Sequence, residues 1–218
     1  MTWPNEYASS TQADGVSQHG RIYFLWLGTP FLLAAVIFIG SAWSDGSFAA
    51  ELARELGTLC LLACIVGRCW CALHIGGRKN LTLVTSGPYR LSRNPLYLFS
   101  TIGLSGLGLM LGSYVIAVAL FAFGFLTFHF MTKREEEVLR QQFGAEYASY
   151  CSGVPAFFPR FQWHLLKSHD TAPEREYSPR ALQRTFWDAF AFCLFLPLSE
   201  AIEFLHDGGL VQPLLRLY

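Results

Sequence analysis

One long stretch without charged residues does most to constrain the fold of this 218-residue chain. Residues 95 to 132 contain no Asp, Glu, Lys or Arg. About 20 apolar residues cross a bilayer as a helix, so this stretch is long enough for two crossings. Gly112 and Ser113 near its middle are typical turn residues, and Gly106 and Gly108 allow neighbouring helices to approach closely. The stretch therefore predicts a tight helical hairpin inside a membrane.

The composition supports a membrane protein. Hydrophobic residues make up 52% of the chain and charged residues only 15%, whereas an average soluble domain has about 25% charged residues. The net charge is zero, which argues against general nucleic-acid binding. Membrane lipids are therefore the expected surroundings, and nucleic acid is not an expected partner.

Three further segments are candidates for spans. Residues 22–43 carry no charge, and residues 56–75 are apolar apart from Arg68 near one end. Residues 185–205 are apolar but contain acidic residues and a proline, so they form either a fifth span or a helix lying in the membrane interface. The sequence thus predicts an all-α integral membrane protein with about five transmembrane helices. We divide it into residues 1–75 with the first two spans, 76–161 around the hairpin, and 162–218 with the polar linker and last apolar helix.

The loops that flank the hairpin are basic. They carry Arg78, Lys79, Arg90 and Arg93 before it, and Lys133, Arg134 and Arg140 among others after it. Basic loops stay on the cytoplasmic side of a membrane, and the turn of the hairpin has no basic residue. Both flanks are therefore expected to meet at the cytoplasmic face, where a functional site could form.

Six cysteines do not form a recognisable metal site. Four of them lie in one apolar stretch without paired C-x-x-C spacing: Cys60, Cys64, Cys69 and Cys71. Zinc sites and disulfide frameworks have other patterns and other contexts. We interpret these cysteines as small packing residues of a membrane helix and expect no metal.

The polar residues beside the hairpin allow two interpretations. Arg90 and Arg93 either anchor the chain at the membrane surface or line a site. The glutamates 135–137 point about 100° apart on a helix, so they cannot all face one site. They either open a new helix that ends near Phe143 and Gly144, where acids offset the helix macrodipole, or contribute a functional carboxylate. His74 is either an ordinary hydrogen-bonded helix residue or part of a site.

The order of the motifs goes further. Residues 83–89 read LVTSGPY and residues 93–97 read RNPLY. After the predicted hairpin come Glu135, Glu136, Leu139, Phe143, Gly144, Glu146, Tyr147, Tyr150, Val154, Pro155 and Pro159. In order and spacing, the region 74–161 resembles the isoprenylcysteine carboxyl methyltransferase family and the related small membrane methyltransferases of the phospholipid methyltransferase type.

The resemblance implies methyl transfer from S-adenosylmethionine to a lipophilic small molecule or a lipid-modified substrate at the cytoplasmic membrane face. It implies a cofactor pocket made of His74, Leu81, Thr82, Leu83, Val84, Tyr89, Asn94, Pro95, Leu96 and Tyr97. The acidic motif after the hairpin implies Glu135 on the substrate side, where it would also be the catalytic base for a thiol or amine acceptor. A carboxylate acceptor, the favoured one, is already ionised and needs no base.

This chain departs from the family pattern at two positions. Met131 stands on the substrate side where the family has an arginine. Nearby Arg134 or Lys133 is the candidate for a compensating catalytic cation, although helix geometry puts both on other faces. Asn94 stands where the family usually has histidine. Its amide can still donate a hydrogen bond to the cofactor but carries no positive charge.

Two other classes of function compete with methyl transfer. An NADPH-dependent sterol or enone reductase of the membrane has a similar motif around residues 93–97. A non-enzymatic scaffold or transporter would use the same helices, although transporters often contain inverted repeats and this chain has no repeat. Binding of S-adenosylhomocysteine but not NADPH would favour methyl transfer.

Overall fold

The computed structural model describes residues 39–41, 47–75, 82–159, 179–190, 194, 197–198, 201, 204 and 215–217. The chain divides into two compact units, one of residues 1–40 and 202–216 and one of residues 41–201 and 217–218. Two short strands, β1 (Ile39–Ser41) and β2 (Leu215–Leu217), pair with each other. All helices described below lie in the second unit. The domain boundaries after residues 75 and 161 stay predictions.

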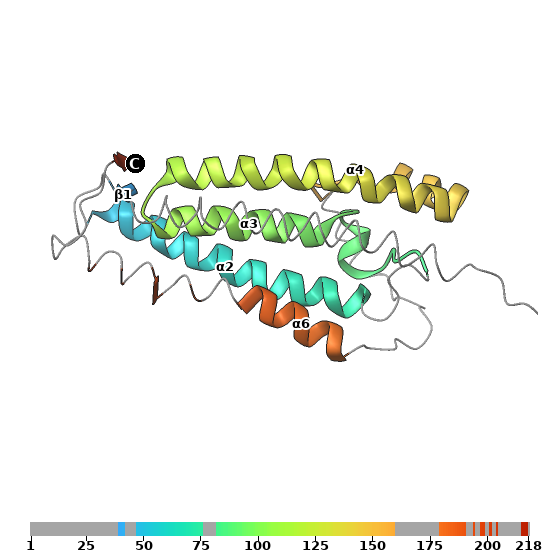
Figure 1. Ribbon diagram of the computed structural model, residues 1–218, viewed down its shortest axis with the longest axis horizontal. Coiled ribbons are helices and arrows are strands. Elements are labelled where there is room, and N and C mark those ends of the chain that lie inside the picture. The colour runs from blue at the N-terminus through green and yellow to red at the C-terminus, as the bar shows by residue number, and fades with distance from the viewer. Residues whose placement is uncertain are drawn as a thin grey trace, which may run out of the picture. The chain divides into compact units, whose positions relative to one another are not determined.

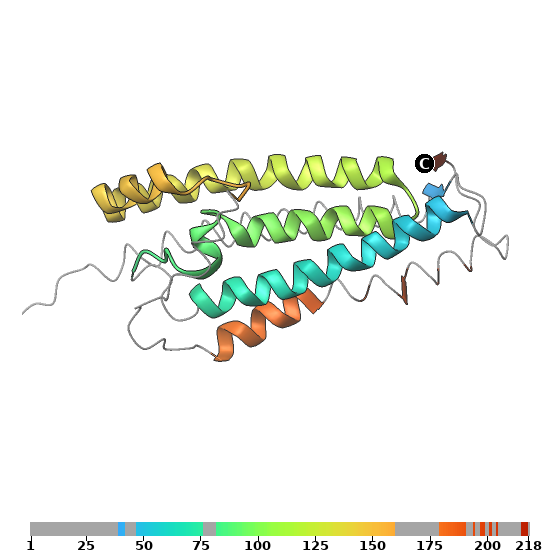
Figure 2. The same cartoon turned by 180° about the vertical axis from the view of Figure 1, so that it is seen from behind.

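Four helices of the second unit lie in a row. The order across the row is α4 (Tyr114–Gly153), α3 (Pro95–Met110), α2 (Phe48–Ile75) and α6 (Pro179–Phe190), as Figures 1 and 2 show from opposite sides. Helix α3 packs against both α2 and α4, and α6 packs against α2. A short 3-10 helix, η1 (Gly87–Arg90), precedes α3 and touches α2. The polar flanks of the hairpin therefore lie where α2 ends and α3 begins, at one end of the helix axes.

The predicted hairpin is confirmed. Helix α3 ends at Met110 and α4 begins at Tyr114, so Leu111 to Ser113 form the turn. The Ser113 side chain caps α4 by accepting a hydrogen bond from the Ile116 amide at 3.3 Å, as serine does at many helix starts. The turn is buried at Ser113, so the two helices leave it already in contact.

Small residues allow the close packing of α3. A Cβ atom added to Gly108 would clash with the backbone of Ala117 on α4, and one added to Gly106 would meet α2 at Cys60 and Gly57. Cys64 and Cys71 of α2 form no disulfide and are fully buried. Their interpretation as small packing residues is therefore confirmed.

The glutamates 135–137 do not open a new helix, so that interpretation was wrong. They lie in the middle of α4, whose first turn contains no acidic residue. The physical reason is that no Gly or Pro occurs from Phe125 to Phe143, so nothing interrupts the helix where the charged residues begin. These glutamates therefore do not interact with the macrodipole at a helix N-terminus.

The break predicted near Phe143 and Gly144 is confirmed at Gly144. Its φ of 50° and ψ of −118° are not helical, and a positive φ of this kind is accessible mainly to glycine. A Cβ atom at Gly144 would meet nothing within 4 Å, so backbone conformation and not space explains the glycine. The residues after it form a second arm of α4 that folds back along the first, as Figure 1 shows.

The membrane prediction is confirmed in part. In the described residues, α2 and α4 are long and apolar enough to cross a bilayer, while α3 is apolar but shorter, with 16 residues. The predicted span 22–43 lies outside the described residues except at Ile39–Ser41, which form a strand and not a helix end. Helix α6 covers only the start of the predicted segment 185–205, and most of the rest also lies outside the described residues. Five spans are therefore not established.

The packing at Gly108 gives a stability prediction. Gly108→Ala should lower the free energy of unfolding by about 1–3 kcal/mol, because the methyl group forces α3 and α4 apart. Thermal unfolding in detergent measures this. Gly153→Ala is the control, since a Cβ atom there meets nothing, and equal midpoints for both variants would contradict the close approach.

Candidate functional site

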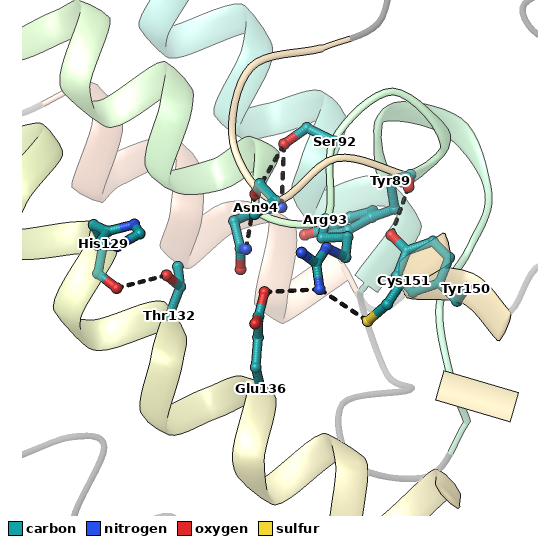
Figure 3. A network of polar contacts seen from close by, with 10 residues as sticks. Tyr89, Ser92, Arg93, Asn94, His129, Thr132, Glu136, Tyr150 and Cys151 are labelled. Carbon is teal, nitrogen blue, oxygen red and sulfur yellow. Dashed lines mark hydrogen bonds and ion pairs between the residues drawn. The ribbon is translucent and has the colours of Figure 1, made fainter. Parts of the chain in front are cut away.

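Arg93 lies at the centre of a polar network at the start of α3. Its Nη1 atom forms an ion pair with Glu136 at 3.1 Å and donates to the Cys151 Sγ at 2.8 Å, as Figure 3 shows. The two side chains are only 15% and 21% exposed for Arg93 and Glu136. Glu136 and Cys151 belong to different arms of α4. In a straight helix their Cα atoms would be about 22 Å apart, so this network requires the bend at Gly144.

A strap, residues 155–157, crosses the same corner and bonds to residues 92–94. The Arg93 amide donates to the Pro155 carbonyl at 2.9 Å, and the Asn94 Nδ2 donates to the Ala156 carbonyl at 2.9 Å. The fully buried Ser92 hydroxyl donates to the Phe157 carbonyl at 2.8 Å and accepts from the Asn94 amide at 3.3 Å. These bonds fix the turn before α3 against the end of α4.

Aromatic rings hold the far end of the strap. Phe125 of α4 meets Phe157 edge-on at 4.9 Å and stacks on Phe158 at 5.7 Å. On its own helix Phe125 also stacks with His129, at 5.9 Å. Such ring pairs add to the stabilisation from buried apolar area. Phe157 is therefore held both by the hydrogen bond at its carbonyl and by the packing of its ring.

Glu135 faces α3, in contrast to its neighbours on either side. Its Oε1 atom accepts a hydrogen bond from the Tyr97 hydroxyl at 2.8 Å. The ring of Tyr97 stacks on Phe128 at 4.9 Å and is buried. Because the second carboxylate oxygen also has acceptor capacity, Glu135 can accept a hydrogen bond from a further donor. The predicted substrate residue and the predicted cofactor residue are thus in direct contact.

His74 and the η1 turn form the other side of the corner. The imidazole of His74 lies directly against Gly87, the first residue of η1. Its Nδ1 atom is 3.0 Å from the Trp70 carbonyl. Tyr89 is buried, and its carbonyl accepts from the Tyr150 hydroxyl at 2.6 Å. The end of α2 and the turn before α3 therefore meet.

The remaining predicted pocket residues lie on the loop and the first turn of α3. Thr82 is exposed, while Leu83 and Val84 are half-buried and belong to no helix or strand. Pro95 is the buried first residue of α3, and Leu96 beside it is half-buried. Leu81 lies outside the described residues.

The residues predicted on the substrate side do not all lie on one face of α4. Met131 lies one turn before Glu135 on α4 and is half-buried like it. Arg134 is exposed and does not share their face, as a 100° step along a helix dictates. Met131 and Glu135 thus remain together, whereas the structure does not bring Arg134 to the Tyr97–Glu135 pair.

Burial raises the pKa of the tyrosines on the second arm of α4. The pKa values of Tyr147 and Tyr150 lie well above the usual value, chiefly because burial disfavours the phenolate, and neighbouring acidic groups add to the effect. For Arg93, burial lowers the pKa, but the opposing charges of Glu136 and its neighbours more than compensate and raise it overall. Arg93 is therefore a permanent cation.

Sequence reasoning missed several members of the network. Ser92, Glu136, Cys151 and the strap received no role, although Glu136 and the strap belong to the motifs that were compared. One signal was available, since adjacent glutamates must face different partners and Arg93 offers a charge to one of them. Nothing in the sequence indicated the contact with Cys151.

The chain was compared with known proteins. A family model described as "Phospholipid methyltransferase" matches residues 59–146. The cobalt-zinc-cadmium resistance protein CzcN of Cupriavidus metallidurans is 36% identical over 187 residues, which cover 86% of this chain and 83% of the relative. The chain belongs to the phospholipid methyltransferase family. The nickel-cobalt-cadmium resistance protein NccN of Alcaligenes xylosoxydans xylosoxydans is 39% identical over 164 residues, which cover 75% of each chain. No solved structure matches.

Family membership confirms the resemblance found in the motifs. The matched region contains α2 from residue 59, the turn with η1, the hairpin and the first arm of α4. It therefore contains the predicted cofactor residues and Glu135. Together with the two long apolar helices, membership indicates a membrane-associated methyltransferase family protein.

The residues at this corner fit S-adenosylmethionine, the usual methyl donor of the family. Half-buried Leu83, Val84 and Leu96 offer apolar contacts for an adenine. Asn94 uses one amide hydrogen on Ala156, and an amide nitrogen has two, so one donor remains for a carboxylate. Among the described residues no group of three or more His, Cys, Asp or Glu side chains could hold a metal ion.

A double-mutant cycle tests the Arg93–Glu136 pair. Arg93→Met should lower the free energy of unfolding by about 2 kcal/mol, because it leaves a partly buried carboxylate without its partner. Glu136→Met should act similarly, and the double variant should cost less than the two together by at least about 1 kcal/mol. Arg140→Met and Glu137→Met, at exposed positions, are the controls. Additive effects at positions 93 and 136 would contradict the pair.

The raised tyrosine pKa values predict sensitivity to alkali. In the unfolded chain tyrosine ionises at a pKa of about 10, below its pKa in the folded protein. The contribution of these tyrosines to the free energy of unfolding is therefore fully present below about pH 10 and is lost as the pH rises above it. Tyr150→Phe should show a smaller fall, although it loses about 1 kcal/mol at neutral pH with the hydrogen bond to Tyr89. Thermal midpoints measured from about pH 8 to 11 decide this, and identical slopes would contradict it.

Proposed function

We propose that this protein is an S-adenosylmethionine-dependent methyltransferase, embedded in the membrane as a multi-pass protein, that methylates a lipophilic acceptor. The observation that supports this most directly is the Tyr97–Glu135 hydrogen bond of 2.8 Å. It joins a residue of the proposed cofactor pocket to an acidic residue just beyond the charge-free part of α4. A water-soluble cofactor and a lipid-embedded acceptor would have to meet at such a place.

The length of α4 supports a site at the membrane surface. From Tyr114 to Thr132 the helix contains no charged residue and rises about 28 Å, close to the ~30 Å thickness of the hydrocarbon layer. Lys133 and the glutamates would then lie just outside it. We assign this face to the cytoplasm, because both flanks of the hairpin are basic.

The proposed mechanism depends mainly on alignment. When bound, the cofactor supplies a methyl group on a sulfonium, which the acceptor attacks in line. The chain's own residues orient the reactants and exclude water, and orientation alone can supply several kcal/mol. The Arg93 network and the strap hold the turn with Asn94 in place, and Tyr97 fixes the Glu135 carboxylate. Leu83, Val84 and Leu96 contribute apolar contacts.

The role of Glu135 depends on the acceptor. A carboxylate oxygen, as in isoprenylcysteine-type methylation, is the favoured acceptor and has no proton to remove. An amine or thiol must lose a proton, and Glu135 is then the base. Both relatives are named for metal resistance, and we propose that methyl transfer by this chain contributes to such resistance through its lipophilic product.

Ligand binding tests the cofactor. S-adenosylhomocysteine should raise the thermal midpoint of the purified protein and NADPH should not, because only a ligand of the folded state stabilises it. Stabilisation by NADPH alone would favour the reductase instead. Absence of any binding to S-adenosylmethionine in calorimetry would contradict the proposed function.

Turnover tests the site. With labelled S-adenosylmethionine and a membrane lipid extract, Glu135→Gln should lower methyl transfer about 100-fold or more if it removes a proton, and less than about tenfold if it only aligns. Tyr97→Phe should lower it less than Glu135→Gln does. The exposed Glu137→Gln is the control. Full turnover in both site variants would refute the assignment. If methyl transfer contributes to metal resistance, cells that carry Glu135→Gln should also lose resistance to cobalt.

A further inference from the structure

Arg68 is a cation on an apolar helix without a carboxylate partner in the described part of the chain. It is half-buried on α2, and its Nη1 atom donates to the Ser100 hydroxyl of α3 at 2.5 Å. That hydroxyl donates in turn to the Leu96 carbonyl at 2.8 Å. The Nε atom of Arg68 is buried and has no hydrogen-bond partner among the residues that the structure describes.

No described residue compensates the positive charge of Arg68 in this arrangement. A hydroxyl neutralises no charge, and a guanidinium group offers five N–H donors, of which Ser100 receives one. Charged residues on membrane helices are costly, and they normally pair with an opposite charge or serve a functional pathway. A buried donor without a partner adds a further cost. An anionic ligand would satisfy both the charge and the remaining donors.

The depth of Arg68 indicates where such a ligand would come from. The Tyr97–Glu135 bond sets Tyr97 level with Glu135, just beyond the point where the charge-free part of α4 ends. Ser100 lies one turn deeper on α3, about 4.5 Å along the axis. Arg68, bonded to Ser100, is therefore level with the boundary of the hydrocarbon layer, next to the lipid headgroups.

We propose that Arg68 binds the phosphate or carboxylate of an acidic membrane amphiphile. The acidic group of such a lipid lies at this depth, and its apolar tail would extend along the side of α2 that Arg68 shares with the half-buried Ile65, three residues earlier on the helix. The amphiphile is either a bound companion lipid or the methyl acceptor itself. The binding site does not depend on methyl transfer, so it can be tested apart from the proposed function.

Lipid-dependent stability tests the site. The full chain is placed in nanodiscs of phosphatidylcholine with increasing fractions of phosphatidylglycerol, an acidic lipid, and thermal midpoints are measured. The wild type should be stabilised by phosphatidylglycerol, and Arg68→Gln should need at least about tenfold more of it, since a charge-assisted hydrogen bond is lost. Arg68→Lys should retain part of the effect.

Two matched variants act as controls. Arg54→Gln, the same substitution on the first half of α2, and Ser100→Ala, which removes the neutral partner, should both keep the response to phosphatidylglycerol. If Arg68→Gln does not fold, a lost response in Arg68→Lys with a full response in Arg54→Gln still supports the site. An unchanged response in Arg68→Gln overturns the proposal.

Further arms separate the sources of the anion. S-adenosylhomocysteine should stabilise Arg68→Gln as much as it stabilises the wild type. If Arg68→Gln loses this stabilisation but keeps its response to phosphatidylglycerol, Arg68 belongs to the cofactor site and the proposal is overturned. A double-mutant cycle of Arg68→Gln with Asp188→Asn of α6 tests for an internal ion pair. Non-additive effects on stability, together with no response of the wild type to phosphatidylglycerol, would reveal such a pair and overturn the proposal. If the lipid response is lost, an equal loss of turnover identifies the amphiphile as the acceptor, and unchanged turnover identifies a companion lipid.

Discussion

The contacts of one nitrogen atom, Nη1 of Arg93, determine how the polar end of this protein is built. This atom lies 3.1 Å from Glu136 and 2.8 Å from Cys151, so both arms of α4 must converge on the first turn of α3. The bend at Gly144 makes that convergence possible. The strap then continues from the second arm and closes over residues 92–94. Without the cation, the partly buried Glu136 carboxylate would lose its ion-pair partner, which is costly.

Adjacent glutamates of this network have different partners. Glu136 holds the arms together, and Glu135, one residue earlier, faces Tyr97 on α3. Their side chains differ in direction by about 100°, so adjacent residues of one helical turn reach different partners. In the membrane arrangement proposed above, the acidic residues of α4 would be held at a fixed height above the hydrocarbon layer, because they continue the same helix as its apolar part. A lipid acceptor would then meet Glu135 without leaving the bilayer.

Much of this arrangement could be predicted from the sequence, for reasons that differ between elements. The hairpin followed from the lack of charge in residues 95–132 and from turn residues at its middle, since both act locally. The break at Gly144 was also local. The continuity of α4 past Thr132 was missed because a change in composition was read as a change in structure, although no helix-breaking residue occurs there. The family pattern placed Tyr97 and Glu135 in one site, and the structure joins them directly.

Long-range pairings could not be predicted in the same way. The bond between Arg93 and Cys151 links positions far apart in the chain, and it depends on the angle of a bend that the sequence does not specify. Asn94 was expected to serve a cofactor, whereas one of its amide hydrogens already bonds to Ala156. Its substitution for the histidine of the family pattern therefore concerns the strap as well as any ligand.

The strap has a consequence for how this protein can vary in evolution. All its hydrogen bonds to residues 92–94 use main-chain carbonyls, those of Pro155, Ala156 and Phe157. A carbonyl is present whatever the side chain, so position 156 is free to change without loss of these bonds. The donors are not interchangeable in this way, because Ser92 and Asn94 contribute through their side chains. Substitutions should therefore be tolerated more readily at position 156 than at Ser92, whose hydroxyl donates the hydrogen bond to Phe157.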